Sequence, residues 1–408
     1  MKRFLAILGV LTCGLLVSCS TPPRAAQGGP LILISIDAFR WDYLQIHDAP
    51  TIKSLAEAGV HATKLIPSFP SKTFPNHYTL VTGLYPAHHG IVANWFYDPV
   101  DNAKFDMTKT DARWWSGGEP VWITAEKQGV RAGCFFWPGA EAEHQGRRPT
   151  LFKPFDKKLK AAERVDGLLA WLALPPDQRP KFFTLYFDIV DDMGHKFGPL
   201  APETKAAVKE ADEAIARLLA GLERLGLRDS ANLVIVSDHG MSETSPEQTV
   251  FFEELMDIKK VRVEATGPYG GVRPNPGVDT DALIAEIRKK LPPAIKVYRR
   301  EEVPAELHYR DGRSIPPILL LAEDHWTIEE KSRWSVAWAR TSRATHGWDP
   351  AFPNMGAFFT AVGPAFKPRT EIPAVANIHL YNLLCEVLGI KPARNDGDRR
   401  LVDAALAR

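Results

Sequence analysis

The sequence predicts an α/β fold: a doubly wound, mostly parallel sheet sandwiched by helices, with a small α+β insertion. Two observations lead to this prediction. Strand-like and helix-like segments alternate along the chain, and the strongest strand-like runs are apolar on both faces, as in the centre of a parallel sheet. The 408 residues are enough to bury a large core. The 50 Lys and Arg against 49 Asp and Glu leave a net charge of +1, which offers no basic excess for binding a nucleic-acid polymer.

The N-terminal segment has the pattern of an export signal. A basic start precedes an apolar run over residues 4–17 that is short for a membrane span, and small residues follow it. Leu16-Val17-Ser18-Cys19 resembles a bacterial lipobox, which implies cleavage before Cys19 and a lipid on its thiol. We therefore expect a lipoprotein signal peptide at residues 1–18, a tether at 19–29, and an exported, periplasmic protein held at the membrane only through Cys19. Whether Cys134 and Cys385 pair stays open.

Three apolar runs are the expected central strands, at residues 31–36, 182–190 and 233–236. Helical periodicity fits residues 51–58, 165–172, 203–225 and 377–388. We assign the catalytic core to residues 30–248 and 341–395, followed by a C-terminal tail at 396–408.

The pattern of segments changes between residues 249 and 340, and we interpret this region as the small α+β insertion. Two segments there are strand-like, at 261–264 and 318–322, and residues 281–291 are amphipathic. A Gly- and Pro-rich stretch covers residues 267–277.

Acidic residues and histidines fall where the predicted strands end. Each of the three runs ends at a carboxylate, and ligands of open α/β sheets bind at the carboxyl ends of strands. Carboxylates and imidazoles without cysteine are typical ligands of zinc or a similar divalent ion. One Asp-His pair alone is more often a strand-end salt bridge, but several such elements favour a metal site. They are Asp37, Asp191 with His195, Asp238 with His239, and His346.

Thr73 precedes a predicted helix. Read alone, it is a helix N-cap, with Pro75 tolerated in the first turn. Backbone donors at a helix N-terminus also favour an approaching phosphate. Metal coordination would lower the pKa of the Thr73 hydroxyl and turn it into a nucleophile.

Several longer motifs resemble those of a known protein family. They are Lys72-Thr73-Phe74-Pro75-Asn76-His77-Tyr78, Val81-Thr82-Gly83-Leu84-Tyr85-Pro86, His89-Gly90-Ile91, Phe135-Phe136-Trp137-Pro138-Gly139, Asp191 with Gly194-His195 and Gly198-Pro199, Ser237-Asp238-His239-Gly240-Met241 and His346-Gly347. From Leu31 to about Asn395 the chain resembles the nucleotide pyrophosphatase/phosphodiesterase family of the alkaline phosphatase superfamily. The resemblance implies an alkaline-phosphatase-like fold, and we expect a bacterial stand-alone catalytic domain.

The resemblance also implies two Zn²⁺ ions and a covalent mechanism. One ion would be held by Asp191, His195 and His346, and the other by Asp37, Asp238, His239 and the Thr73 hydroxyl. Thr73 would attack phosphorus and form a phosphothreonine, which water would hydrolyse. The Asn94 amide and the Thr73 backbone N–H would bind the charge on the phosphoryl oxygens.

The substrate assignment rests on two aromatic rings. Phe155 falls where nucleotide-cleaving members of the family carry a stacking Tyr, and Phe74 matches the opposite face of that sandwich. The implied activity is release of nucleoside 5′-monophosphates from nucleotide diesters and pyrophosphates. A diesterase for phospholipid head groups or glycerophosphodiesters is the alternative, and a lipoprotein that binds nucleotides without cleaving them is a third reading. The oligomeric state stays open.

Other conspicuous residues are interpreted as structural. His77, His88 and His89 are expected to be hydrogen-bond donors, and Trp114 and Trp115 to pack a loop.

Overall fold

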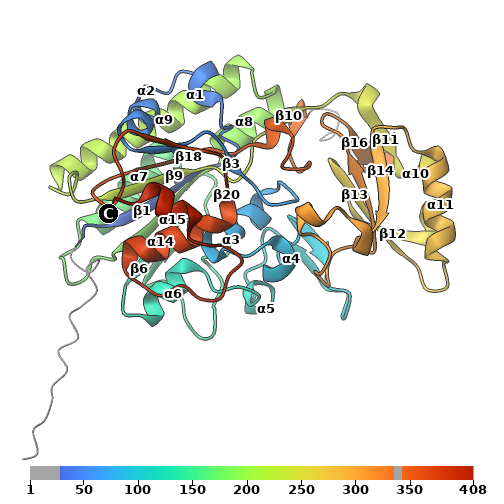
Figure 1. The fold of residues 1–408 in the computed structure, drawn as a ribbon, viewed down its shortest axis with the longest axis horizontal. Coiled ribbons are helices and arrows are strands. Elements are labelled where there is room, and N and C mark those ends of the chain that lie inside the picture. Colours follow the sequence, from blue (N-terminus) through green and yellow to red (C-terminus); the bar gives the residue numbers. More distant parts are fainter. Residues whose placement is uncertain (1–27, 335–341, 408) are drawn as a thin grey trace, which may run out of the picture.

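Strand β1 (Leu31–Ile36) lies at the centre of the sheet in this computed structural model, which describes residues 28–334 and 342–407 (Figure 1). Its side chains alternate between two apolar layers. Leu31 and Leu33 pack on one side of the sheet, and Ile32, Ile34 and Ile36 on the other. Both faces of β1 are therefore buried, which explains why its sequence is almost continuously aliphatic.

The sheet is mostly parallel. Only β18 runs against its neighbours among the strands that pair in it. In spatial order the strands are β19 (Thr370–Ile372), β2 (Val60–Ala62), β18 (Phe359–Val362), β9 (Asn232–Val236), β1, β8 (Phe182–Phe187), β6 (Ala132–Phe135) and β7 (Leu151–Lys153).

Helices cover both faces of this sheet, which confirms the predicted fold class. The layer around Ile34 is shared with α2 (Pro50–Ala58), α7 (Ala161–Leu172) and α9 (Pro202–Arg224). The layer around Leu33 is shared with α3 (Thr73–Thr82), α6 (Val121–Lys127), α14 (Leu380–Leu388) and α15 (Arg400–Ala405).

A second sheet lies at one end of the molecule (Figure 1). Its strands, in order, are β12 (Val261–Ala265), β13 (Tyr269–Pro274), β15 (Ile318–Ala322) and β14 (Ile295–Arg299). It shares a core with α10 (Phe252–Leu255) and α11 (Thr280–Lys290), and β11 (Thr249–Phe251) pairs with β16 (Thr327–Glu329) beside it. Strand β13 lies inside the Gly- and Pro-rich stretch, because Gly270 and Gly271 leave room for Phe252 and Pro316 to approach the backbone.

The remaining elements are short. They are α1 (Tyr43–Ile46), α4 (Pro86–His89), α5 (Ala112–Trp115), α8 (Ile189–Phe197), α12 (Lys331–Trp334), and the pairs β3 (Leu65–Ile66) with β20 (Val375–Ala376), β4 (Trp95–Tyr97) with β5 (Lys104–Asp106), and β10 (Ser242–Glu243) with β17 (Ala344–Thr345). Single 3-10 turns cover Pro246–Gln248, Ile258–Lys260, Arg300–Glu302, Ala305–Leu307, Pro353–Met355 and Asn377–His379.

Two expectations about these elements are wrong. The apolar run at 182–190 is not one strand: β8 ends at Phe187 and α8 begins at Ile189, because the buried Val190 continues the apolar pattern into a helix. The described part of the predicted C-terminal tail, residues 396–407, contains a packed helix. Leu401, Val402 and Ala405 form the buried face of α15.

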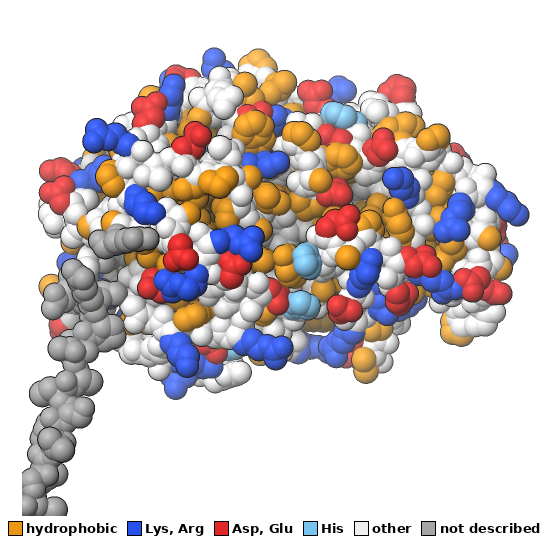
Figure 2. Space-filling view, in the orientation of Figure 1, with side chains coloured by type: hydrophobic (Ala, Val, Ile, Leu, Met, Phe, Trp, Pro, Cys, Tyr) orange, Lys and Arg blue, Asp and Glu red, His pale blue; other side chains and the backbone are white. Residues whose placement is uncertain are grey.

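The proposed signal peptide and Cys19 lie outside the described residues, as does most of the tether. Within residues 28–334 and 342–407, every helix is too short or too polar to cross a bilayer. Figure 2 shows acidic and basic side chains interspersed over the visible face.

Candidate active site

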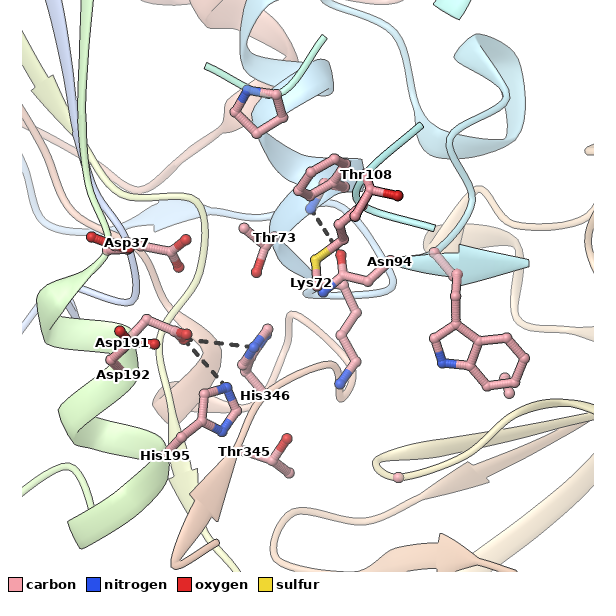
Figure 3. Close-up of a pocket in the computed structure, with 18 of the residues that line it drawn as sticks. Asp37, Lys72, Thr73, Asn94, Thr108, Asp191, Asp192, His195, Thr345 and His346 are labelled. Carbon is pink, nitrogen blue, oxygen red and sulfur yellow. Dashed lines mark hydrogen bonds and ion pairs between the residues drawn. The ribbon is translucent and has the colours of Figure 1, made fainter. Parts of the chain in front are cut away.

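The candidate site lies where several elements of the main sheet end. Asp37 follows β1, Asp238 and His239 follow β9, and His346 follows β17. Asp191 and His195 lie one turn apart on α8 and not at a strand end, so the helix presents both to the same place (Figure 3). Thr73 is the first residue of α3.

Lys72, and not Thr73, occupies the N-cap position of α3. The predicted capping role of Thr73 is therefore wrong. Its Oγ1 lies 3.3 Å from Nε2 of His239, and α3 has no side-chain cap hydrogen bond. Thr73 is 8% exposed, and its hydroxyl lies beside the acids and histidines of the site.

Asp191, His195 and His346 form one cluster (Figure 3). Oδ1 of Asp191 lies 3.4 Å from Nε2 of His195 and 3.7 Å from Nε2 of His346. One donor atom from each residue falls within 4.8 Å of the others, a spacing that a single cation can bridge.

The second cluster surrounds His239. Its Nε2 lies 2.9 Å from Oδ2 of Asp238 and 3.5 Å from Oδ1 of Asp37. Two overlapping groups of possible ligands result, Asp37 with Asp191 and His239, and Asp37 with His77 and Asp238. The two clusters thus adjoin through Asp191, and the rings of His239 and His346 stack with centroids 3.5 Å apart.

The three histidines present the same ring nitrogen to the site. Nδ1–H donates to a backbone carbonyl in each: to Ala344 from His195 at 2.8 Å, to Gly240 from His239 at 2.8 Å, and to Ser71 from His346 at 2.7 Å. Such bonds leave Nε2 as the unprotonated, metal-binding nitrogen.

The carboxylates fit a bound cation equally well. Oδ1 of Asp37, Oδ1 of Asp191 and Oδ2 of Asp238 are buried without a hydrogen-bond partner among the described residues. Oδ2 of Asp238 and Nε2 of His239 lie 2.9 Å apart, close enough for one cation to bind both atoms. A divalent cation would satisfy these atoms, whereas the bare protein pays for burying them.

Burial and neighbouring charges shift the pKa values of several of these carboxylates and of one histidine. Burial, together with the neighbouring Asp238, raises the pKa of Asp37 well above its usual range, and burial also raises the pKa of Asp191. Burial would raise the pKa of Asp238 too, but His239 and His77 outweigh it and hold that pKa well below its usual range. Burial and the nearby charges of His239 and Lys72 lower the pKa of His346 well below its usual range.

Asn94 is held beside the helix start. Its Oδ1 accepts the Phe74 backbone N–H at 2.9 Å, so the opposite, Nδ2 side of the amide is left for another partner. Both residues line a cavity of about 730 Å³ that also contains Thr73, Asp37, Asp191, His195 and His346. The structure therefore brings Asn94 to the site, as expected.

Phe74 and Phe155 line the same cavity. Phe74 is partly buried against the rings of Phe105 and Trp115, at centroid distances of 6.2 Å and 6.0 Å. Phe155 is 46% exposed and contacts Phe136 and Tyr186 edge-on. Trp115 is buried, as predicted, but it also lines the cavity, which was not predicted.

Sequence reasoning missed two residues of the site. Tyr186, on β8, donates its hydroxyl to Oδ2 of Asp37 at 2.6 Å, a contact between neighbouring strands that no local motif announces. Lys72 also lines the cavity, and its place directly before Thr73 was the available signal. His77 has hydrogen-bond partners on both ring nitrogens, since Ser35 Oγ lies 2.8 Å from its Nε2 and its Nδ1–H donates to the Thr73 carbonyl at 2.9 Å. Its Nδ1 also lies 3.3 Å from Oδ2 of Asp238, so the expectation that His77 is structural stays a prediction.

Together, these residues form a candidate site for divalent cations with a hydroxyl at its edge, on a helix-covered, mostly parallel sheet. The family model for type I phosphodiesterase / nucleotide pyrophosphatase matches residues 31–349. The chain belongs to this family of hydrolytic enzymes.

The relatives support this placement. A venom phosphodiesterase of Crotalus durissus collilineatus is 37% identical over 386 residues, which are 92% of this chain and 46% of the relative. An uncharacterised pyrophosphatase/phosphodiesterase of Schizosaccharomyces pombe is 36% identical over 90% of this chain and 78% of its own length. The chain spans about half the length of the venom enzyme.

Solved structures show the same fold. Human ectonucleotide pyrophosphatase/phosphodiesterase 5 superimposes with a TM-score of 0.87 at 31% identity, covering 92% of this chain and 99% of the human chain. The murine counterpart, solved as an inactive threonine-to-alanine variant in complex with AMP, gives a TM-score of 0.87 at 30% identity, covering 93% and 100%.

Proposed function

We propose that this protein is a two-zinc phosphodiesterase that releases nucleoside 5′-monophosphates from nucleotide diesters and pyrophosphates. The observation that carries the proposal is the Thr73 hydroxyl, 3.3 Å from His239, at a helix start beside Asn94 and the acid-histidine clusters. The AMP complex of the murine relative supports a nucleotide substrate.

The chain offers ligands for two ions. Asp191, His195 and His346 would hold one, and Asp37, Asp238, His239 and the Thr73 hydroxyl would hold the other. Bound zinc would lower the pKa of the Thr73 hydroxyl and offset negative charge on the phosphoryl group.

Thr73 is the nucleophile in this proposal. Its Oγ attacks phosphorus, the bond to the leaving oxygen breaks, and the phosphoryl group is carried on Thr73. The Nδ2 side of Asn94 and the Thr73 backbone N–H bind the phosphoryl oxygens, and the helix N-terminus favours their charge. Water then attacks phosphorus, breaks its bond to Thr73 Oγ, and releases the nucleoside monophosphate.

A head-group diesterase is the second candidate. Glu329 and Trp334 line the cavity, and an acid with an aromatic ring suits a quaternary ammonium such as choline. An assay of an aryl diester of a nucleotide, an aryl phosphate monoester and aryl phosphorylcholine decides between them. We expect the nucleotide diester to have the highest kcat/KM. A faster reaction of the choline ester would replace the nucleotide assignment with the second candidate.

We further propose that residues 30–248 and 341–395 form the catalytic core, with 249–340 inserted, and that the protein is exported and anchored through Cys19. The lipobox-like Leu16-Val17-Ser18-Cys19 supports the anchor. In a cell that lipidates exported proteins, Cys19→Ala should release the protein from membrane fractions or block its processing. An unlipidated mature N-terminus at another residue, found by mass spectrometry, would refute the anchor.

A further inference from the structure

Lys72 places a cation beside the proposed reaction centre. It precedes Thr73 directly and lines the same cavity. Figure 3 shows Lys72 at the site together with Thr73 and His346. The end of its side chain lies beside Gly347, which follows His346, and its charge acts on the His346 ring.

Gly347 makes room for this side chain. It has a φ of +127°, and a Cβ at that position would lie 2.4 Å from Cε and 3.0 Å from Nζ of Lys72. The lysine therefore runs across a surface that only a residue without a side chain leaves open. Its ammonium is held on the side of the cavity where His346 lies.

Within the described part of the chain, the Lys72 ammonium has no close counter-ion. Among the described residues it makes no hydrogen bond or ion pair within 4.0 Å, although the more distant charges of Glu329 and Asp191 act on it. Lys72 is partly buried where it lines the cavity, so an anionic ligand would be bound favourably by its ammonium.

The position of Lys72 fits the leaving group. Thr73 Oγ1 lies against His239, and in an in-line displacement the leaving oxygen departs on the side opposite the attacking oxygen. In the proposed mechanism Thr73 belongs with Asp37, Asp238 and His239, so the other cluster, formed by Asp191, His195 and His346, would face the leaving oxygen. The Lys72 ammonium lies beside Gly347, the residue that follows His346.

We infer that Lys72 is a specificity-determining residue that binds the phosphate of an anionic leaving group, and so favours pyrophosphate bonds over esters of uncharged alcohols. This inference rests on the proposed nucleotide hydrolase function. It adds a preference for substrates such as nucleoside triphosphates.

Two thymidine substrates isolate the effect. Thymidine 5′-triphosphate and p-nitrophenyl thymidine 5′-monophosphate share the base, the sugar and the attacked phosphorus, and differ in the leaving group. In the zinc-loaded protein, Lys72→Met should lower kcat/KM for the triphosphate by about 10-fold to 100-fold, the usual worth of a charged hydrogen bond. The aryl ester should change by less than about 3-fold, since Thr73, Asn94 and the metal ligands are untouched.

Lys53→Met, on the exposed surface of α2, is the matched control and should leave both rates unchanged. An equal loss with both substrates, or no loss with the triphosphate, would overturn the inference while leaving the proposed function intact. If the wild-type protein cleaves neither thymidine substrate, the proposed function fails, and the inference fails with it.

Discussion

At the residue scale, the site depends on side chains whose polar atoms are aimed before any substrate arrives. Three Nδ1–H bonds to backbone carbonyls orient His195, His239 and His346, and the Phe74 N–H orients Asn94. Preorganised groups of this kind cost no further ordering when a phosphoryl group binds. The Thr73 hydroxyl lies beside these groups, with its Oγ1 3.3 Å from Nε2 of His239.

Replacing the Thr73 hydroxyl should affect turnover without affecting nucleotide binding. Thr73→Ala should abolish measurable turnover while AMP still binds, because the metal ligands and aromatic rings remain. Steady-state assays and calorimetric AMP titration measure the two properties. Thr82→Ala, on the same helix and outside the cavity, controls for damage to α3. Retention of a tenth or more of the wild-type rate would show that water attacks phosphorus directly.

Phe155 tests the base pocket. Phe155→Ala should lose about 1–3 kcal/mol of stacking on a nucleobase, or roughly 5-fold to 150-fold in kcat/KM for an aryl diester of a nucleotide. A simple aryl diester without a base should react as before. Phe152→Ala is the matched control, since Phe152 is partly buried nearby but does not line the cavity. Equal slowing of both substrates by Phe155→Ala would count against base stacking.

At the element scale, neighbouring strands support each other's ligands. Tyr186 reaches from β8 to Asp37 at the end of β1, which the parallel register of the two strands allows. In the proposed site, one sheet edge would therefore supply both a metal ligand, Asp37, and the group that orients it, Tyr186.

Removing this support should weaken metal binding. Tyr186→Phe deletes only the hydroxyl, and loss of such an orienting bond typically costs 10-fold to 100-fold in metal affinity. Competition with a chelator measures the zinc affinity. Tyr381→Phe deletes a buried, hydrogen-bonded hydroxyl on α14, away from the cavity, and should leave zinc affinity unchanged. Equal affinities for wild type and Tyr186→Phe would contradict the supporting role.

Some strands could be predicted from the sequence and others could not. Residues 31–36 and 233–236 are apolar on both faces, so their strands and the carboxylates that follow were predictable. The apolar run at 182–190 contains the end of a strand and the start of a helix. The sequence did not predict this transition, because a short apolar run fits a buried strand and a buried helix equally well. Strand β13 was missed since its glycines weaken the strand pattern.

The residues of the site that belong to sequence motifs could be predicted. All seven proposed ligands, with Asn94, Phe74 and Phe155, line or adjoin one cavity, and the roles assigned to them stay predictions. The contact of Tyr186 with Asp37 depends on strand register, which no single segment encodes.

At the scale of the whole molecule, the fold concentrates uncompensated charge at one edge of the main sheet. Buried oxygens of Asp37, Asp191 and Asp238 have no hydrogen-bond partner among the described residues, while apolar layers cover both faces of the sheet around them. Divalent cations would offset this charge and stabilise the folded state by mass action.

The metal content of the purified, active protein is the most direct test of the proposed two-zinc mechanism. Elemental analysis should find two zinc ions per chain, and Asp191→Asn should lower that number and the activity together, because both clusters adjoin this carboxylate. One tightly bound ion or none in fully active protein would contradict the two-zinc mechanism.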